Sequence, residues 1–145
     1  MHPKQICDDL SFLGSPLVLD GDDLYIEHPE KVYPELVEYV QSHKKRLIQY
    51  LKGEYTVQDH KVKQTIDKII HYYMGVDQKM NPKIDDWFNH DYESALKFVK
   101  LLVVFWENGW RDLKGSVANF EDEETDKLSL EIYERAMSYF KGKKL

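Results

Sequence analysis

The sequence predicts an α+β fold, mostly α, in which an N-terminal helix–β-hairpin–helix module is followed by a small helical bundle. Apolar residues recur three and four positions apart, the spacing of one helix face, through most of the 145 residues. Residues 20–23 instead form a turn-rich stretch between two short β-prone segments. Hydrophobic residues make up 42% of the chain and charged residues 32%, a composition with enough apolar material for a core.

The first predicted elements are a short helix and a hairpin. Residues 4–13 are apolar at helical spacing, and Gly14 follows as a helix stop. The turn-rich sequence Asp20-Gly21-Asp22-Asp23 then separates residues 16–19 from residues 24–27. This arrangement is typical of a β-hairpin.

Strand alternation divides the hairpin side chains between two faces. The face that we expect to pack on helices carries Leu17, Leu19, Leu24 and Ile26. The opposite face should stay exposed unless a partner covers it, and it carries Val18, Asp20, Tyr25 and Glu27.

A second helix is expected to complete this module. Pro34 and Glu35 suit the first turn of a helix, and an apolar stripe continues from there to Gly53. The stripe is interrupted by the basic residues His43, Lys44, Lys45 and Arg46. We therefore assign residues 1–53 to one αββα module.

Residues 56–145 are expected to form a helical domain. Thr56 and Asp59 have the spacing of a capping box, and an apolar helical face follows them. A polar loop containing Pro82 comes next, and Asp91 suits the N-cap of another helix. That helix is apolar nearly all round over residues 95–106, which is usual for a buried helix. The last helix has a stripe formed by Leu128, Ile132, Tyr133, Ala136, Met137 and Phe140.

Composition narrows the classes of function. The formal net charge of −6 and pI of about 5.5 argue against a surface built as a whole for phosphate groups. Cys7 is the single cysteine, and the N-terminus lacks the apolar stretch of a signal peptide, so we expect a cytoplasmic protein. The longest apolar run is too short for a membrane span. Glycine-rich nucleotide-binding motifs are absent, and we expect no cofactor and no bound metal.

The histidines are the candidates for catalysis or metal binding. His90-Asp91 is a doublet of the kind used by HD-type metal-dependent phosphohydrolases, in which His71 and Asp112 would be the distant ligands. Asp91 suits a helix cap equally well, and the sequence has no pair of histidines four residues apart with acidic support. We therefore expect a protein that is not an enzyme, with the hydrolase as the least favoured alternative.

The cluster His43-Lys44-Lys45-Arg46 is a candidate binding site for an acidic peptide or a phosphate group. The alternative interpretation is a solvated helix face, which is what most runs of charge are. Sites for single-stranded nucleic acid place aromatic side chains, on which bases stack, among basic residues. Aromatic residues do not alternate with this basic cluster in that way. Direct contact with nucleic acid is therefore not favoured.

The first module resembles the N-terminal docking domain of the TubC type, an αββαα module found at the termini of nonribosomal peptide synthetase subunits. The resemblance rests on a glycine-centred hairpin and a late His-Lys pair, within the set Leu10, Leu13-Gly14, Leu17, Leu19, Gly21-Asp22, Leu24, Ile26, Pro29, Pro34-Glu35-Leu36, His43-Lys44, Leu47-Ile48 and Leu51. It implies that an exposed hairpin strand captures a short segment of a partner by strand addition, in a module that is often dimeric in that family. By this resemblance, the docking surface consists of Val18, Asp20, Tyr25 and Glu27.

The resemblance covers only the first third of the chain. Tyr33 stands where the pattern usually has a small hydroxyl residue, and residues 56–145 have no recognised relation to a synthetase domain. Similar αββα modules also begin replication-type proteins of phages and plasmids. A mobile-element accessory regulator, acting on nucleic acid or on a nucleic-acid enzyme, is therefore the alternative function.

These observations predict a small non-enzymatic protein–protein interaction protein, either a docking and adaptor protein or a regulator. We expect its partner to be a protein or peptide, and we expect it to form a homodimer without binding a membrane. The residues predicted to bind the partner are Val18, Asp20, Tyr25, Glu27, His43, Lys44, Lys45 and Arg46.

Overall fold

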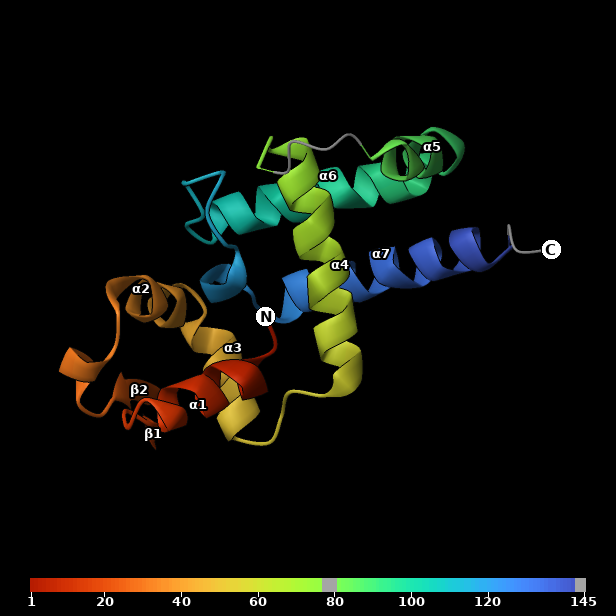
Figure 1. Ribbon diagram of the computed structural model, residues 1–145. Helices are drawn as coiled ribbons and strands as arrows, with labels where there is room; N and C mark the ends of the chain where they lie inside the picture. The colour runs from red at the N-terminus through yellow and green to blue at the C-terminus, as the bar shows by residue number, and fades with distance from the viewer. Residues whose placement is uncertain (77–80, 143–145) are drawn as a thin grey trace. The chain divides into compact units, whose positions relative to one another are not determined.

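The computed structural model describes residues 1–76 and 81–142, and its fold is α+β, mostly α, as the sequence predicts (Figure 1). The chain divides into two compact units, Met1–His60 and Lys61–Leu145. The boundary expected from the sequence lies between residues 53 and 56, just before helix α4. Each unit has a separate set of buried apolar residues.

The first unit contains three α-helices, a hairpin and a short 3₁₀ turn among its described residues. They are α1 (Pro3–Phe12), β1 (Leu17–Asp20), β2 (Asp23–Ile26), η1 (Pro29–Lys31), α2 (Pro34–Ser42) and α3 (Lys44–Leu51). Pro3 begins α1, and the His2 ring accepts a hydrogen bond from the Lys4 amide at 3.0 Å. The core of this unit consists of Ile6, Leu10, Val32, Leu36, Val40 and Leu47.

The hairpin has the predicted turn and register. β1 pairs antiparallel with β2, so that Leu17 lies opposite Ile26 and Val18 lies opposite Tyr25. Gly21 has a φ of +61° in the turn, a backbone conformation that glycine adopts without strain. Because cross-strand partners share a face, this register places Leu17 and Ile26 on one face and Val18 and Tyr25 on the other, as predicted.

The prediction of a single helix after the hairpin is wrong, because two helices occupy this segment. The backbone breaks at His43, which has a φ of −121° and a ψ of 19°. Its ring stacks on Tyr39 with a centroid distance of 3.9 Å, and its Nδ1 lies 2.9 Å from the Tyr39 carbonyl oxygen. The break ends α2 and lets both Val40 and Leu47 reach the core. The order of elements is therefore αββαα rather than αββα.

The second unit is helical throughout its regular elements. These are α4 (Val57–Tyr73), which begins in the first unit, α5 (Pro82–His90), α6 (Tyr92–Glu107), η2 (Ala118–Phe120) and α7 (Glu123–Gly142). Helices α6 and α7 pack side by side, and α4 runs across their direction (Figure 1). The largest buried side chains of the shared core are Trp87, Phe105, Ile70, Leu101 and Ile132.

The predicted helix caps are confirmed. Thr56 and Asp59 form the reciprocal capping box, with the Thr56 amide donating to Asp59 at 2.9 Å and the Asp59 amide donating to the Thr56 hydroxyl at 3.0 Å. Asp91 is the N-cap of α6 and accepts from the Ser94 amide at 3.4 Å.

Helix α5 was expected to be a polar loop around Pro82, and this expectation is wrong. Pro82 is the first residue of α5, where its missing amide proton costs no hydrogen bond. Ile84 and Trp87, three residues apart, are both buried on the core side of the helix. The acidic pair between them masks this short apolar face in the sequence. Residues 77–80 of the expected loop lie outside the described residues.

The expectation that α6 is buried all round is also only half right. Phe98, Leu101 and Phe105 are buried against the other helices. The opposite side of α6 exposes apolar side chains to solvent, beginning with Tyr92 and ending with Trp106. Among the described residues, no helix has the length and apolarity needed to cross a bilayer.

Candidate docking groove beside the hairpin

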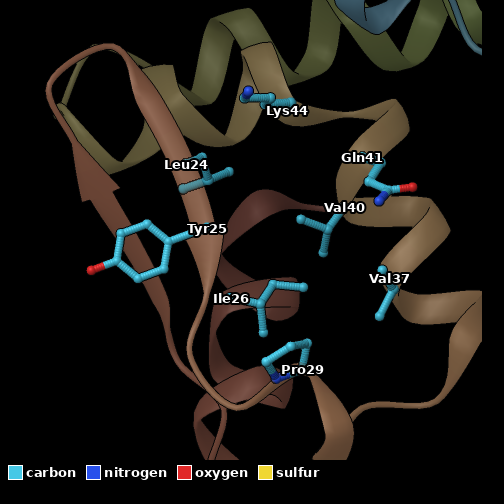
Figure 2. Close-up of a pocket in the computed structure, with 8 residues that line it drawn as sticks. All are labelled: Leu24, Tyr25, Ile26, Pro29, Val37, Val40, Gln41 and Lys44. Atoms are coloured by element: carbon cyan, nitrogen blue, oxygen red, sulfur yellow. The ribbon is translucent and has the colours of Figure 1, made fainter.

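A groove of about 350 Å³ lies in the first unit, between strand β2 and helix α2 (Figure 2). Figure 2 shows Val37 and Val40 pointing from α2 toward the strand, with Pro29 at one end of the groove and Lys44 at the other. The complete lining is Leu24, Tyr25, Ile26, Pro29, Val37, Val40, Gln41 and Lys44.

The floor of the groove is apolar and continuous with the core. Val40 is buried, and Leu24, Ile26 and Val37 are partly buried against the same core cluster. These side chains keep part of their apolar surface open because no further element of the first unit is packed between β2 and α2. An open apolar groove with few polar groups is the usual form of a ligand or peptide site.

The edge of β2 that faces this groove carries backbone groups that the hairpin does not use. The Glu27 amide donates to the Pro16 carbonyl at 3.1 Å, and Leu17 lies opposite Ile26. Because antiparallel pairs alternate between bonded and non-bonded positions, the N–H and C=O of Ile26 must point away from β1. The described residues include none that bonds to these two groups.

Asp23 modifies the edge at the turn end of β2. Its carboxylate accepts a hydrogen bond from the Leu24 amide at 2.8 Å, so this amide has a local partner. The same carboxylate lies 2.5 Å from the Lys44 ammonium, whose hydrogen bond and charge lower the pKa of Asp23. The open backbone groups for a partner strand are therefore centred on Ile26.

The lysines near the turn already have acidic partners. Besides the Lys44–Asp23 pair, Lys52 lies 2.5 Å from Asp22, and this hydrogen bond lowers the pKa of Asp22 and raises that of Lys52. All four side chains are partly or largely exposed, so each pair contributes little to stability. Their effect is to reduce the positive charge that the first unit presents beside the hairpin.

The structure brings together only some of the residues predicted to bind a partner. Tyr25 and Lys44 line the groove, although Figure 2 shows the Tyr25 ring directed away from α2, toward the outer hairpin face. On that face Val18 lies opposite Tyr25. Asp20 and Glu27 are exposed but do not line the groove.

The predicted basic cluster does not form one surface. His43 occupies the break between α2 and α3, where it stacks on Tyr39. Lys45 is exposed, whereas Arg46 is only 7% exposed. The burial of Arg46 leaves it little surface to offer a partner.

Sequence reasoning missed the contribution of α2 to the groove. Val37, Val40 and Gln41 lie on one side of this helix, and Pro29 closes one end. The three-and-four spacing of the α2 residues marks a shared face, which is the signal that could have found them. Leu24 and Ile26 were assigned to packing alone, whereas they both pack on the core and line the groove.

The geometry gives no support to a metal site at His90-Asp91. The Asp91 carboxylate accepts two hydrogen bonds from the Arg135 guanidinium, at 2.6 and 3.1 Å. The Ser94 hydroxyl donates a third, at 2.5 Å. The hydrogen bond from Arg135 is the main reason that the pKa of Asp91 falls to about 2. His90 Nδ1 lies 2.8 Å from the Asp86 carbonyl oxygen. Within residues 1–76 and 81–142, no three or more His, Cys, Asp or Glu residues are placed to hold a metal ion.

No protein-family model, no curated protein and no solved structure matches this chain. The function must therefore be argued from the groove and the strand edge themselves.

Proposed function

We propose that this protein is a non-enzymatic docking protein that captures an extended segment of a partner protein through its N-terminal unit. The observation that carries the proposal is the open edge of β2 at Ile26, which faces an apolar groove walled by α2. Strand edges with open backbone groups bind extended segments by β-augmentation.

The groove also favours particular partner side chains. A strand added to β2 would lie about 4.8 Å from it, on the side where Val37 and Val40 wall the groove. Alternate side chains of the added strand would then enter the groove, because successive residues point to opposite faces. We therefore propose a partner segment with apolar residues at every second position.

The resemblance to docking domains of the TubC type adds support. The break at His43 gives the first unit the element order αββαα, which is the order of that module. Capture of a partner segment by an exposed hairpin strand is also what the resemblance implies. The pathway of the synthetases is not part of our proposal.

Contact with nucleic acid through the basic cluster is less well supported. Lys44 is paired with Asp23, and Arg46 is buried. A phosphate group at this cluster would have to compete with the acidic turn, at a net charge of −6 for the chain. For this reason we propose a protein partner.

Peptide selection on the intact chain tests the proposal. Peptides chosen from a random display library should carry apolar residues at alternate positions, and Val37→Lys should weaken their binding roughly tenfold or more by placing a charge in the groove. Val57→Lys is the matched control, because Val57 is 72% exposed at the start of α4 and does not line the groove.

The selected peptides would contradict the proposal if they bound Val37→Lys as tightly as the unaltered protein. A selection dominated by acidic peptides without alternation would contradict it as well, and would favour the lysines as the site. Circular dichroism and thermal unfolding of both variants establish that any loss of binding does not arise from unfolding.

A further inference from the structure

Helix α6 exposes a row of apolar side chains that no described helix of the second unit covers, and the Arg111 guanidinium lies over the Trp106 ring at one end of the row, 4.1 Å from its centroid. The five side chains of this stripe are between 48% and 71% exposed, and they are Tyr92, Leu96, Val99, Val103 and Trp106. The buried residues of α6 lie on the opposite side of the helix and form part of the core. This stripe is therefore additional to the face that holds the unit together.

The spacing of the stripe is that of a helix–helix seam. Its residues follow one another at intervals of four, three, four and three, so they occupy the two apolar positions of successive heptads. Such a row winds slowly around a helix and packs along its whole length against a second helix at about +20°. A helix with the same spacing is the best-fitting occupant.

The stripe is large enough for a specific contact between two copies. Five large side chains about half exposed present on the order of 500 Å², which is the size of the largest apolar patch on a typical monomer. Two copies would bury about 1,000 Å² in total, near the lower limit for a specific protein interface. Each copy also supplies a helix with the required spacing.

We propose that two copies of this chain associate through α6, with their α6 helices side by side and parallel. This contact lies in the second unit and does not depend on the docking groove of the first. It buries the exposed stripe of each copy against the same stripe of the other, as a two-fold interface requires.

The charges beside the stripe favour the parallel orientation. One flank carries Glu93, Lys100 and Glu107 at seven-residue intervals, whereas the other flank carries the apolar Ala95 and Leu102. In a parallel pair, the charged flank of one copy faces the apolar flank of the other, so that like charges do not meet.

An antiparallel pair is less favourable. In full overlap it places each charged flank against itself, with Lys100 facing Lys100 of the other copy and Glu93 facing Glu107. A shift by one heptad would bring Glu93 opposite Lys100, but it would leave Trp106 outside the contact. Only the parallel arrangement buries the whole stripe without like-charge contacts.

Sedimentation equilibrium of the full chain tests the association. We expect the chain to dimerise as its concentration rises. In Val99→Lys the dissociation constant should rise roughly a hundredfold or more, because each copy places a lysine charge in the apolar interface. Val57→Lys is the matched control, since it changes an exposed valine outside the stripe. A monomer at every concentration, or a dimer that Val99→Lys leaves unchanged, would overturn the proposal.

Tryptophan fluorescence reports which surface is buried. Trp87 and Trp110 are buried, whereas Trp106 is about half exposed, so iodide should quench Trp106 selectively. We expect the quenched fraction to fall as the concentration rises through the dimer range, and to stay constant in Val99→Lys. Quenching that is independent of concentration while the chain dimerises would place the contact elsewhere and refute the proposal.

A cysteine cross-link tests the orientation. In the parallel pair residue 96 lies opposite itself, whereas in the antiparallel pair it lies opposite residue 103, so Leu96→Cys should form a disulfide-linked dimer under mild oxidation, and Val57→Cys should not. The unaltered chain is a suitable background, because burial raises the pKa of the Cys7 thiol and leaves little reactive thiolate. Cross-linking only between Leu96→Cys and Val103→Cys chains would show an antiparallel pair and overturn the parallel arrangement.

Discussion

The carboxylate of Asp91 joins two helices of the second unit. It caps α6 through the Ser94 amide and forms a two-pronged ion pair with Arg135 of α7. A paired carboxylate of this kind stabilises the fold only while it is ionised, and the pKa of Asp91 is lowered to about 2.

Acid should therefore remove the contribution of Asp91 to stability. Because its folded-state pKa lies below the unfolded value, the contribution is complete above about pH 4 and declines as the pH falls toward 2, by on the order of 2 kcal/mol. Urea unfolding at pH 5 should show Asp91→Asn less stable than the unaltered chain. The gap between the two proteins should narrow at pH 2.5, and a gap that does not change with pH would contradict the role of this ion pair.

Lys63 on α4 forms a buried ion pair with Glu121, with the charged atoms 2.8 Å apart and both side chains almost fully buried. Lys63→Met removes this buried ammonium group from Glu121 and from Asp126, 3.2 Å away, and should cost about 3–5 kcal/mol of unfolding free energy. The double variant Lys63→Met with Glu121→Gln should recover part of this loss in chemical denaturation. A double variant less stable than Lys63→Met would contradict the assignment.

At the scale of single elements, the hairpin depends on its two-residue turn. Gly21 has a φ of +61°, and a Cβ added there would meet no atom within 4 Å. Gly21→Ala should therefore destabilise the first unit by about 1 kcal/mol through backbone strain alone. Gly21→Asn should cost about as much, because Asp22 has no positive φ and the two-residue turn is therefore type II′, whose first central residue lies outside the left-handed region that asparagine tolerates. A Gly21→Ala or Gly21→Asn variant as stable as the unaltered chain in denaturant unfolding would contradict this account of the turn.

The elements that the sequence predicted are those with strong local signals. The hairpin follows from its glycine turn between alternating residues, and the starts of α4 and α6 follow from Thr56 and Asp91. Helix α5 and the break at His43 escaped prediction because their signals are short and mixed with charge. The exposed stripe of α6 could not be predicted, because an apolar helix surface looks the same in sequence whether or not another helix covers it.

The candidate groove was predicted only in part for a related reason. Its strand side was foreseen, because alternation identifies the hairpin faces and Tyr25 among them. Its helix side arises where α2 lies opposite β2, and this placement depends on contacts between residues distant in the chain. Val37 and Gln41 carry no local signal that they would face an open strand edge.

At the scale of the whole molecule, each unit has its own buried cluster, and this predicts separate responses to core substitutions. Leu10 is fully buried in the first cluster and Ile132 in the second. Leu10→Ala should cost about 2–5 kcal/mol, and hydrogen exchange should show the loss of protection in α1 to α3 but not in α6 and α7. Ile132→Ala should give the reverse pattern. Equal loss in both units from either substitution would show that they unfold as one.

Docking by strand addition to β2 is tested most directly by the backbone amide of Ile26. This amide faces away from β1, whereas the amide of Tyr25, whose partner is Val18, takes part in the hairpin ladder. Hydrogen exchange followed by NMR should show Tyr25 protected with or without a selected peptide, and Ile26 protected only when the peptide is bound. A peptide that binds while the Ile26 amide exchanges as fast as in the free protein would contradict capture by this strand.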